Sequence, residues 1–158
     1  LGQLDDEGRV ELAAVRRLAE LDKEFFARPD CQAIAMAMAT QESRSRRSDA
    51  PTDLAAVHHN LFGVKWVAPR DAGRYESVDL PPNEFETAPQ RYRVYDSMEH
   101  ALINLRWHLL CSDNYRSLRK LDAEAWLRAI APVWCDANPK HTKELLELFR
   151  AWRARLGS

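Results

Sequence analysis

The stretch MAMATQESRSRRSD, residues 36–49, changes character at a single acid, Glu42. The chain is apolar and helix-forming before this residue, and polar and rich in arginine after it. Ile34, Met38 and Glu42 are spaced by four, so they fall on one face of a helix predicted over residues 31–43. The acid therefore continues an apolar stripe at the C-terminal end of that helix.

An acid in this position has two interpretations. Burial against the core and the negative end of the helix dipole both favour the protonated form of a carboxyl group. A carboxyl group that keeps its proton near neutral pH is what a general acid requires. Arg46, one turn further on, can instead pair with Glu42, and the alternative is a plain surface ion pair.

Length and composition predict one ordinary globular domain over residues 1–158. The net charge of −1 gives no strong field toward nucleic acid or an anionic membrane, and no apolar run approaches the roughly 20 residues of a membrane span. Cys31, Cys111 and Cys135 form no disulfide framework, and we expect three buried thiols. Because the chain begins with Leu1, we expect a domain excised from a longer protein.

The two ends of the chain have a helical period and the middle does not. Apolar spacing and capping residues predict helices over residues 5–27, 31–43, 53–60, 97–111, 122–132 and from 138 onward, capped where visible by Asp30, Thr52, Ser97, Asp122 and Asn138, with Pro132 as a stop. Residues 64–95 contain prolines and glycines, and YESVDL and QRYRVY alternate as short strands do. The sequence therefore predicts an α+β fold, a mostly helical body with a small β-lobe at about 64–95, and a cleft between them.

Three motifs in order resemble a known family. ATQES ends the predicted helix, HNLFGVKW follows at residues 59–66, and RYRVYDS follows at 91–97. In this order they resemble the glucosaminidase family of peptidoglycan hydrolases, glycoside hydrolase family 73. Its pattern is QxxLES, NLFGIK, a hairpin bearing TxEY, FRxYxS and a final YATDPxY. The resemblance spans about residues 30–150 and implies a lysozyme-like fold.

The resemblance also implies roles for individual residues. Glu42 falls on the catalytic general acid, and LPPNEF at residues 80–85 places Glu84 on a second acid in the lobe. VWCDANPKH at residues 133–141 resembles the YATDPxY segment. The residues that we expect to bind substrate, through the turn or the aromatic walls of the cleft, are Asn60, Phe62, Tyr92, Trp134 and His141. No metal or other cofactor is implied.

The implied activity is hydrolysis of the β-1,4 bond between N-acetylglucosamine and N-acetylmuramic acid, which makes the chain a glycoside hydrolase. One departure motivates an alternative. The family follows its acid with SGWG, whereas residues 43–46 here are SRSR. The alternative is a catalytically weak or inactive module of the same fold that binds peptidoglycan.

Two other classes of site are less favoured. His108, Cys111, Cys135 and His141 could supply a zinc site, but no CxxC pair is present. RSRR at residues 44–47 is a small basic patch with no nucleic-acid recognition motif beside it, so a solvated helix end is the simpler interpretation.

The expected partner is the glycan strand of peptidoglycan, with no nucleic acid and no membrane span. Other domains of a longer chain, or an inhibitor protein, are further candidate partners. The expected location is the periplasm or the extracellular cell wall of a bacterium, or the wall attacked by a phage enzyme.

Overall fold

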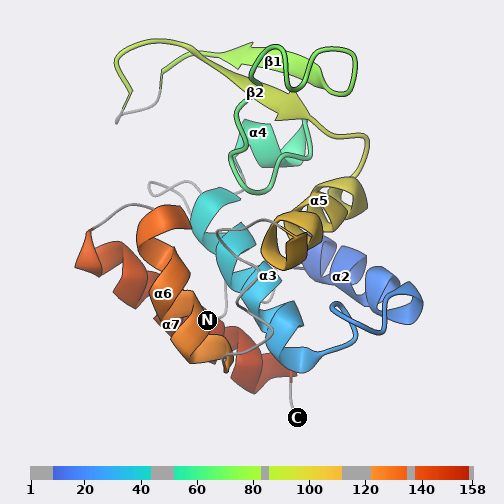
Figure 1. Ribbon diagram of the computed structural model, residues 1–158, viewed down its shortest axis with the longest axis vertical. Helices are drawn as coiled ribbons and strands as arrows, with labels where there is room; N and C mark the ends of the chain where they lie inside the picture. Colours follow the sequence, from blue (N-terminus) through green and yellow to red (C-terminus); the bar gives the residue numbers. More distant parts are fainter. Residues whose placement is uncertain (1–8, 44–51, 83–85, 112–121, 135–137, 157–158) are drawn as a thin grey trace.

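The computed structural model describes residues 9–43, 52–82, 86–111, 122–134 and 138–156. In chain order its elements are α2 (Arg9–Leu21), α3 (Pro29–Ser43), α4 (Asp53–Ala56), β1 (Glu76–Leu80), β2 (Gln90–Val94), α5 (Met98–Cys111), α6 (Ala123–Trp134) and α7 (Pro139–Leu156). The longer helices form one body, and the strands form a lobe at its upper end, with α4 between the two (Figure 1). The predicted α+β plan, with a helical body and a small β-lobe, is confirmed.

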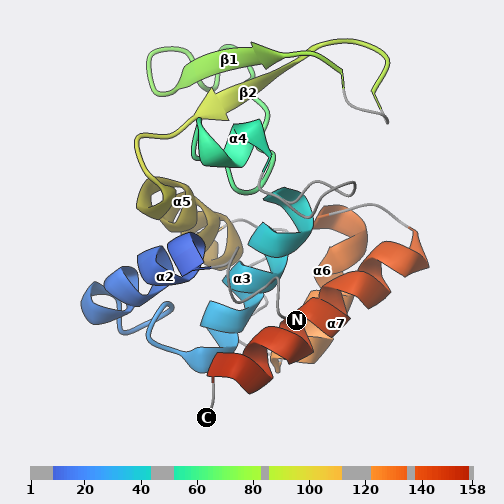
Figure 2. The same ribbon diagram turned by 180° about the vertical axis from the view of Figure 1, so that it is seen from behind.

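Helix α3 is the centre of the body. It lies between α2 and α5 on one side and α6 and α7 on the other, in both views of the ribbon (Figures 1 and 2). Its buried residues cover all its sides rather than one stripe: Cys31, Ala33, Ile34, Ala35, Met36, Ala37, Met38 and Ala39. Ile34 and Met38, which were predicted to share an apolar face, are both fully buried, and alanines on the other faces let neighbouring helices approach from all sides.

Several helix starts are confirmed by their caps. The backbone N–H of His100 donates to Ser97 Oγ at 3.1 Å, and the N–H of Ala125 donates to Asp122 Oδ1 at 2.9 Å. The N–H of Lys140 donates to Asn138 Oδ1 at 3.0 Å, and that of Ala55 to Thr52 Oγ1 at 3.4 Å. These side chains satisfy N–H groups that have no partner within the helix.

Other predicted bounds are wrong for local reasons. Helix α2 ends at Leu21 instead of 27, because Asp22 Oδ1 accepts from the N–H groups of Glu24 and Phe25 at 3.0 and 3.1 Å and starts a turn there. Helix α3 begins at Pro29, so Asp30 lies in its first turn and is not the N-cap. Helix α4 ends at Ala56 rather than near residue 60.

Pro132 lies inside α6 and does not end it. The helix continues to Trp134, only two residues further, so the hydrogen bond that a proline cannot donate is lost only in the last turn. This extension keeps Trp134 on the helix.

The lobe is a two-stranded antiparallel sheet with a third segment beside it. β1 pairs with β2 in the register Glu76 with Val94 through Leu80 with Gln90. On the other edge of β2, Lys65 forms an isolated bridge with Tyr92, and the N–H of Trp66 donates to the Arg91 carbonyl at 2.9 Å. The chain that leaves α4 therefore joins the sheet directly.

The structure tests two expectations that were based on composition. Cys31 is buried, but Cys111 at the end of α5 is exposed, so the expectation of three buried thiols is wrong; Cys135 lies outside the described residues. None of the described helices combines the length and the apolar character that crossing a membrane requires.

Candidate functional site

The predicted acid, Glu42, lies at the last turn of α3, where the body meets the lobe. It is half-buried. A Cβ atom added to Gly63 would be 4.0 Å from Glu42 Oε2, so the carboxylate lies against the backbone of the NLFGVK turn. Gly63 has φ +65°, a conformation that suits glycine. The structure therefore brings together two of the three motifs that carry the resemblance.

Asn60 builds the turn that faces Glu42. Its side chain is 1% exposed, and its Nδ2 donates to the carbonyls of Val64 and Arg93, both at 2.9 Å. Its Oδ1 accepts from the Val64 N–H at 3.0 Å. These bonds go to backbone groups, so the amide holds residues 60–64 against β2 and positions the turn.

Phe62 and Trp134 form one aromatic wall. Phe62 is buried, Trp134 is half-buried, and their ring centroids lie 6.0 Å apart at 72° in an edge-to-face arrangement. One ring comes from the turn and the other from the end of α6, so the contact joins the turn to the helical body. Aromatic pairs of this kind add about 0.5–1.5 kcal/mol beyond the burial of their area.

His141, in the first turn of α7, is tied to the residue before the acid. Gln41 Nε2 donates to the His141 backbone carbonyl at 3.0 Å. His141 is half-buried. The hydrogen bond fixes the start of α7 beside the end of α3, which places His141 next to the Glu42 end of that helix.

Tyr92 on β2 is hydrogen-bonded to an acidic residue of the lobe. Its hydroxyl donates to Glu86 Oε2 at 3.0 Å, and burial together with that hydrogen bond raises the pKa of Tyr92 to about 12. Glu84, the predicted second acid, lies outside the described residues. Of the other lobe acids, Asp79 pairs with Arg91 at 2.9 Å and Glu76 is exposed at the start of β1.

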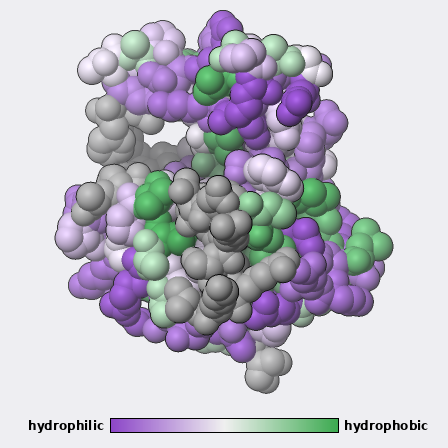
Figure 3. Space-filling model, in the orientation of Figure 1, coloured by the Kyte–Doolittle hydropathy of each residue, from purple (hydrophilic) through white to green (hydrophobic). Residues whose placement is uncertain are grey.

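Together these contacts place a carboxylate at the junction of body and lobe. Figure 3 shows the molecule hollowed between these two parts. A carboxyl group at a helix end that lies against a backbone turn can donate a proton to a ligand held between the parts. The carboxylate lies against Gly63 of the turn after α4, and Gln41, the residue before it, is bonded to the start of α7.

Sequence reasoning missed the buried pair that supports the lobe. Asp71 is fully buried and Arg93 is 4% exposed, and the Arg93 guanidinium binds the Asp71 carboxylate through two bonds, of 2.8 and 3.1 Å. The signal was present in QRYRVY, where strand alternation places Arg93 on the same face as Tyr95. A buried arginine needs an acidic partner, and the sequence alone does not say which one.

Replacing Trp134 tests the aromatic wall. We expect Trp134→Ala to weaken glycan binding and turnover together, and Trp134→Tyr to retain both, because a phenol ring keeps the contact with Phe62. Thermal melts beside binding assays measure this. Trp126→Ala is the reference for a fully buried indole, with a cost of about 3–5 kcal/mol. A loss of stability that large in both Trp134 variants, with normal activity per folded molecule, would contradict the assignment.

The structure tests the two alternative sites, zinc and nucleic acid, only within the described residues. Within the described residues no three His, Cys, Asp or Glu side chains gather as metal ligands, and Cys135 lies outside them. The basic stretch at residues 44–47, including Arg46, also lies outside the described part of the chain.

Comparison with known proteins identifies the fold. No family model and no curated protein matches the chain. Among solved structures, the glycoside hydrolase domain of Salmonella typhimurium FlgJ superposes with a TM-score of 0.64 at 18% identity, over 96% of this chain and 89% of that one. A peptidoglycan hydrolase mutant from Sphingomonas sp. A1 gives 0.61 at 20% identity, over 98% and 97%.

The catalytic domain of the autolysin Auto from Listeria monocytogenes gives a TM-score of 0.60 at 13% identity, over 99% of this chain and 97% of that one. The likeness thus covers nearly the whole of each chain compared, body and lobe together. The chain has the lysozyme-like fold of these hydrolase domains, as its motifs predicted.

Proposed function

We propose that this chain is a peptidoglycan hydrolase of the glucosaminidase family, with Glu42 as its general acid. The observation that carries the proposal is the contact between the Glu42 carboxylate and Gly63 of the NLFGVK turn. Two motifs chosen from the sequence meet at one point, in a fold shared with solved peptidoglycan hydrolases. The bond we assign is the β-1,4 bond between N-acetylglucosamine and N-acetylmuramic acid.

The proposed reaction begins with the transfer of one proton from Glu42 to the substrate. Glu42 donates its proton to the glycosidic oxygen while the bond from that oxygen to the anomeric carbon breaks, and the ring gains oxocarbenium character. The leaving sugar departs as an alcohol. Water then adds its hydroxyl group to the anomeric carbon and releases its other proton, so the complete cycle consumes one water and leaves Glu42 protonated again. General acid catalysis of this kind contributes about 10²–10⁴-fold.

The second step has two routes. Glu84 can act as a base on the attacking water, which inverts the anomeric configuration. Alternatively the N-acetyl carbonyl of the substrate attacks first, which retains the configuration without an enzyme nucleophile. Glu86, hydrogen-bonded to Tyr92, is a further acid of the lobe, so Glu84→Gln and Glu86→Gln compared side by side identify the base.

We assign binding of the glycan substrate to the aromatic residues and the turn. Trp134 and Tyr92 offer ring surface to the apolar faces of sugars, the buried Phe62 packs behind Trp134, and Asn60 keeps the turn in place. His141 adds a polar group near the acid. With a wall polymer as substrate, we propose action in the periplasm or the extracellular wall, with the glycan strand as the principal partner.

A binding module without turnover is the second candidate, and the SRSR sequence at residues 43–46 favours it. Incubation of the protein with insoluble peptidoglycan separates the two functions. An enzyme generates new reducing ends with time, whereas a binding module co-sediments with the wall and generates none. We expect new reducing ends, in proportion to enzyme and time.

A further inference from the structure

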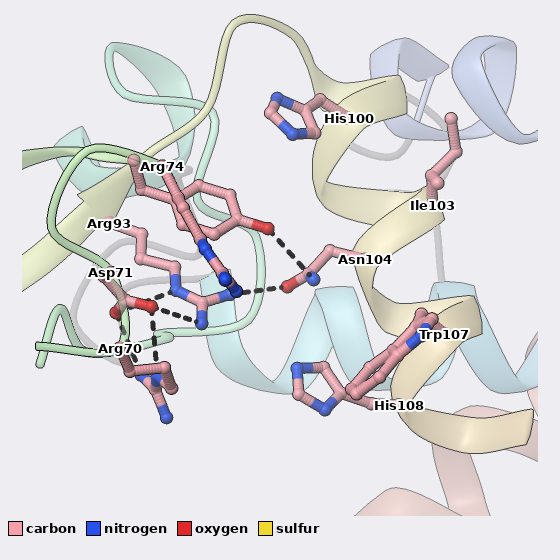
Figure 4. Close-up of a pocket in the computed structure, with 10 residues that line it drawn as sticks. Arg70, Asp71, Arg74, Arg93, His100, Ile103, Asn104, Trp107 and His108 are labelled. Carbon is pink, nitrogen blue, oxygen red and sulfur yellow. Dashed lines mark hydrogen bonds and ion pairs between the residues drawn. The ribbon is translucent and has the colours of Figure 1, made fainter. Parts of the chain in front are cut away.

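A pocket lies between the β-lobe and α5, lined by residues that are not among those assigned to the Glu42 site. It has a volume of about 560 Å³. Figure 4 shows its two walls: Arg70, Asp71, Arg74 and Arg93 come from the lobe, and His100, Ile103, Asn104, Trp107 and His108 come from α5. The pocket therefore combines a charged wall with a helical wall that is partly apolar.

The charged wall has more arginine than acid. Asp71 accepts from Arg93 and also from Arg70, whose Nε and Nη2 donate at 3.0 Å each. One carboxylate thus accepts hydrogen bonds from two guanidinium groups. Burial alone raises the pKa of Asp71, but the hydrogen bonds from Arg70 and Arg93 outweigh it, so its pKa is well below the usual range and Asp71 stays ionised.

Donors remain on this wall after the internal pairing. Arg70 uses Nε and Nη2, and its Nη1 donates to no described residue. The exposed Arg74 side chain makes neither a hydrogen bond nor an ion pair with the described part of the chain. Guanidinium donors are arranged as a fork that matches a carboxylate, and such bonds are about twice as strong as neutral ones.

The other titratable groups add no negative charge inside the pocket. Burial, and then the positive charges of Arg93 and Arg70, lower the pKa of His108, which favours its neutral form. His100 faces Asp96 at 3.9 Å, and the Asp96 side chain is fully exposed. Among the lining residues Asp71 is the acid, and it is already shared. The pocket therefore has a positive potential.

The α5 wall supplies apolar surface beside this charge. Trp107 is 55% exposed and Ile103 is 50% exposed, which is unusual for such large apolar side chains. A phosphate or sulfate alone would leave this surface in water. A carboxylate on an aliphatic chain, such as an amino acid of a peptide, uses both the arginines and the apolar wall.

The pocket is connected to the Glu42 site through one strand residue. The N–H of Arg93 donates to the Val64 carbonyl at 3.0 Å, and the Arg93 carbonyl accepts from Asn60 Nδ2 at 2.9 Å. Val64 follows Gly63, which lies against Glu42. The side chain of Arg93 thus forms the pocket base while its backbone holds the turn of the site.

We propose that the pocket between the lobe and α5 binds a carboxylate of the peptide stem that branches from the glycan strand. Arg74 and the outer Nη1 of Arg70 are its donors, and Trp107 packs against the aliphatic part of the stem. The inference rests on the proposed function, because such a stem arrives attached to the glycan. It makes the protein prefer wall strands that carry unmodified stems.

Two matched ligands test the pocket. They are a soluble disaccharide that carries a stem peptide with free carboxylates, and the same molecule with those carboxylates amidated. Titration calorimetry on the Glu42→Gln protein keeps both ligands intact. We expect the free carboxylates to increase affinity at least about tenfold, equivalent to about 1.4 kcal/mol. When Arg74→Gln is combined with Glu42→Gln, the affinities for the two ligands should become nearly equal. The control Arg16→Gln, which changes an exposed arginine on α2, should leave the preference for free carboxylates unchanged.

Any one of three results would overturn the inference. The two ligands could bind with equal affinity, the preference for free carboxylates could persist in the Arg74→Gln variant, or neither ligand could bind. Failure of the proposed function has a different signature. If the wild-type protein generates no new reducing ends from purified peptidoglycan, whose stems are intact, the hydrolase assignment is wrong, and the carboxylate preference is judged separately by its own ratio.

Discussion

Glu42→Gln is expected to lose glycan cleavage by at least about 10²-fold while the protein keeps its fold. Glutamine has the size of glutamate but no acidic proton to give to the leaving oxygen. Because Glu42 is half-buried at a helix end, the exchange should leave the melting temperature nearly unchanged. The rate at which new reducing ends form, measured beside a thermal melt, tests both statements.

The matched control is Glu20→Gln, an exposed glutamate on α2. It should cleave as the wild type does. Near-native turnover by a well-folded Glu42→Gln protein would remove Glu42 from the mechanism and leave the fold as the part of the account that stands.

Asp71→Asn should give the largest loss of stability among single changes in the lobe. The carboxylate is fully buried and binds Arg93 and Arg70, and its Oδ2 also accepts from the Val67 N–H at 3.0 Å. Removal of one partner leaves the other charge buried without compensation, at a cost of about 3–5 kcal/mol. For a chain of this size that corresponds to a melting temperature about 10 °C lower.

The effect should depend on pH with a defined sign. The pKa of Asp71 is lowered in the folded protein, so its contribution is present above its unfolded pKa of about 4 and is lost as pH falls through the folded value. The gap in melting temperature between wild type and Asp71→Asn should therefore narrow below about pH 4.

Asp79→Asn is the control for this prediction. Asp79 also binds an arginine, Arg91 at 2.9 Å, but both side chains are exposed. Solvent screens an exposed pair, so the melting temperature should barely change. Equal losses for Asp71→Asn and Asp79→Asn would contradict the view that burial makes the Asp71 pair important.

The helical body was predictable because its signals are local. Ser97, Asp122 and Asn138 cap the helices that follow them, as their sequence positions indicated. The end of α2 was not predictable from apolar spacing, since Phe25 continues the period although Asp22 has already turned the chain. The full burial of α3 was also missed, because periodicity does not show how many neighbours a helix has.

The candidate site was predictable at the level of motifs and not of contacts. The order of ATQES and NLFGVK indicated Glu42 and the turn, and the structure places them against each other. The bonds of Asn60 and the Phe62–Trp134 pair depend on tertiary placement, so no spacing could give them. The pocket beside α5 was missed for the same reason, since Arg74 and Trp107 are far apart in sequence.

The identity of the new reducing-end sugar tests the central claim most directly. Purified peptidoglycan is digested with the wild-type protein, the products are reduced with borohydride, and the terminal sugar is identified by mass. The account predicts reduced N-acetylglucosamine, and none in the Glu42→Gln digest. Reduced N-acetylmuramic acid would contradict the assigned bond, and the absence of any new reducing end would contradict the assignment of this protein as a hydrolase.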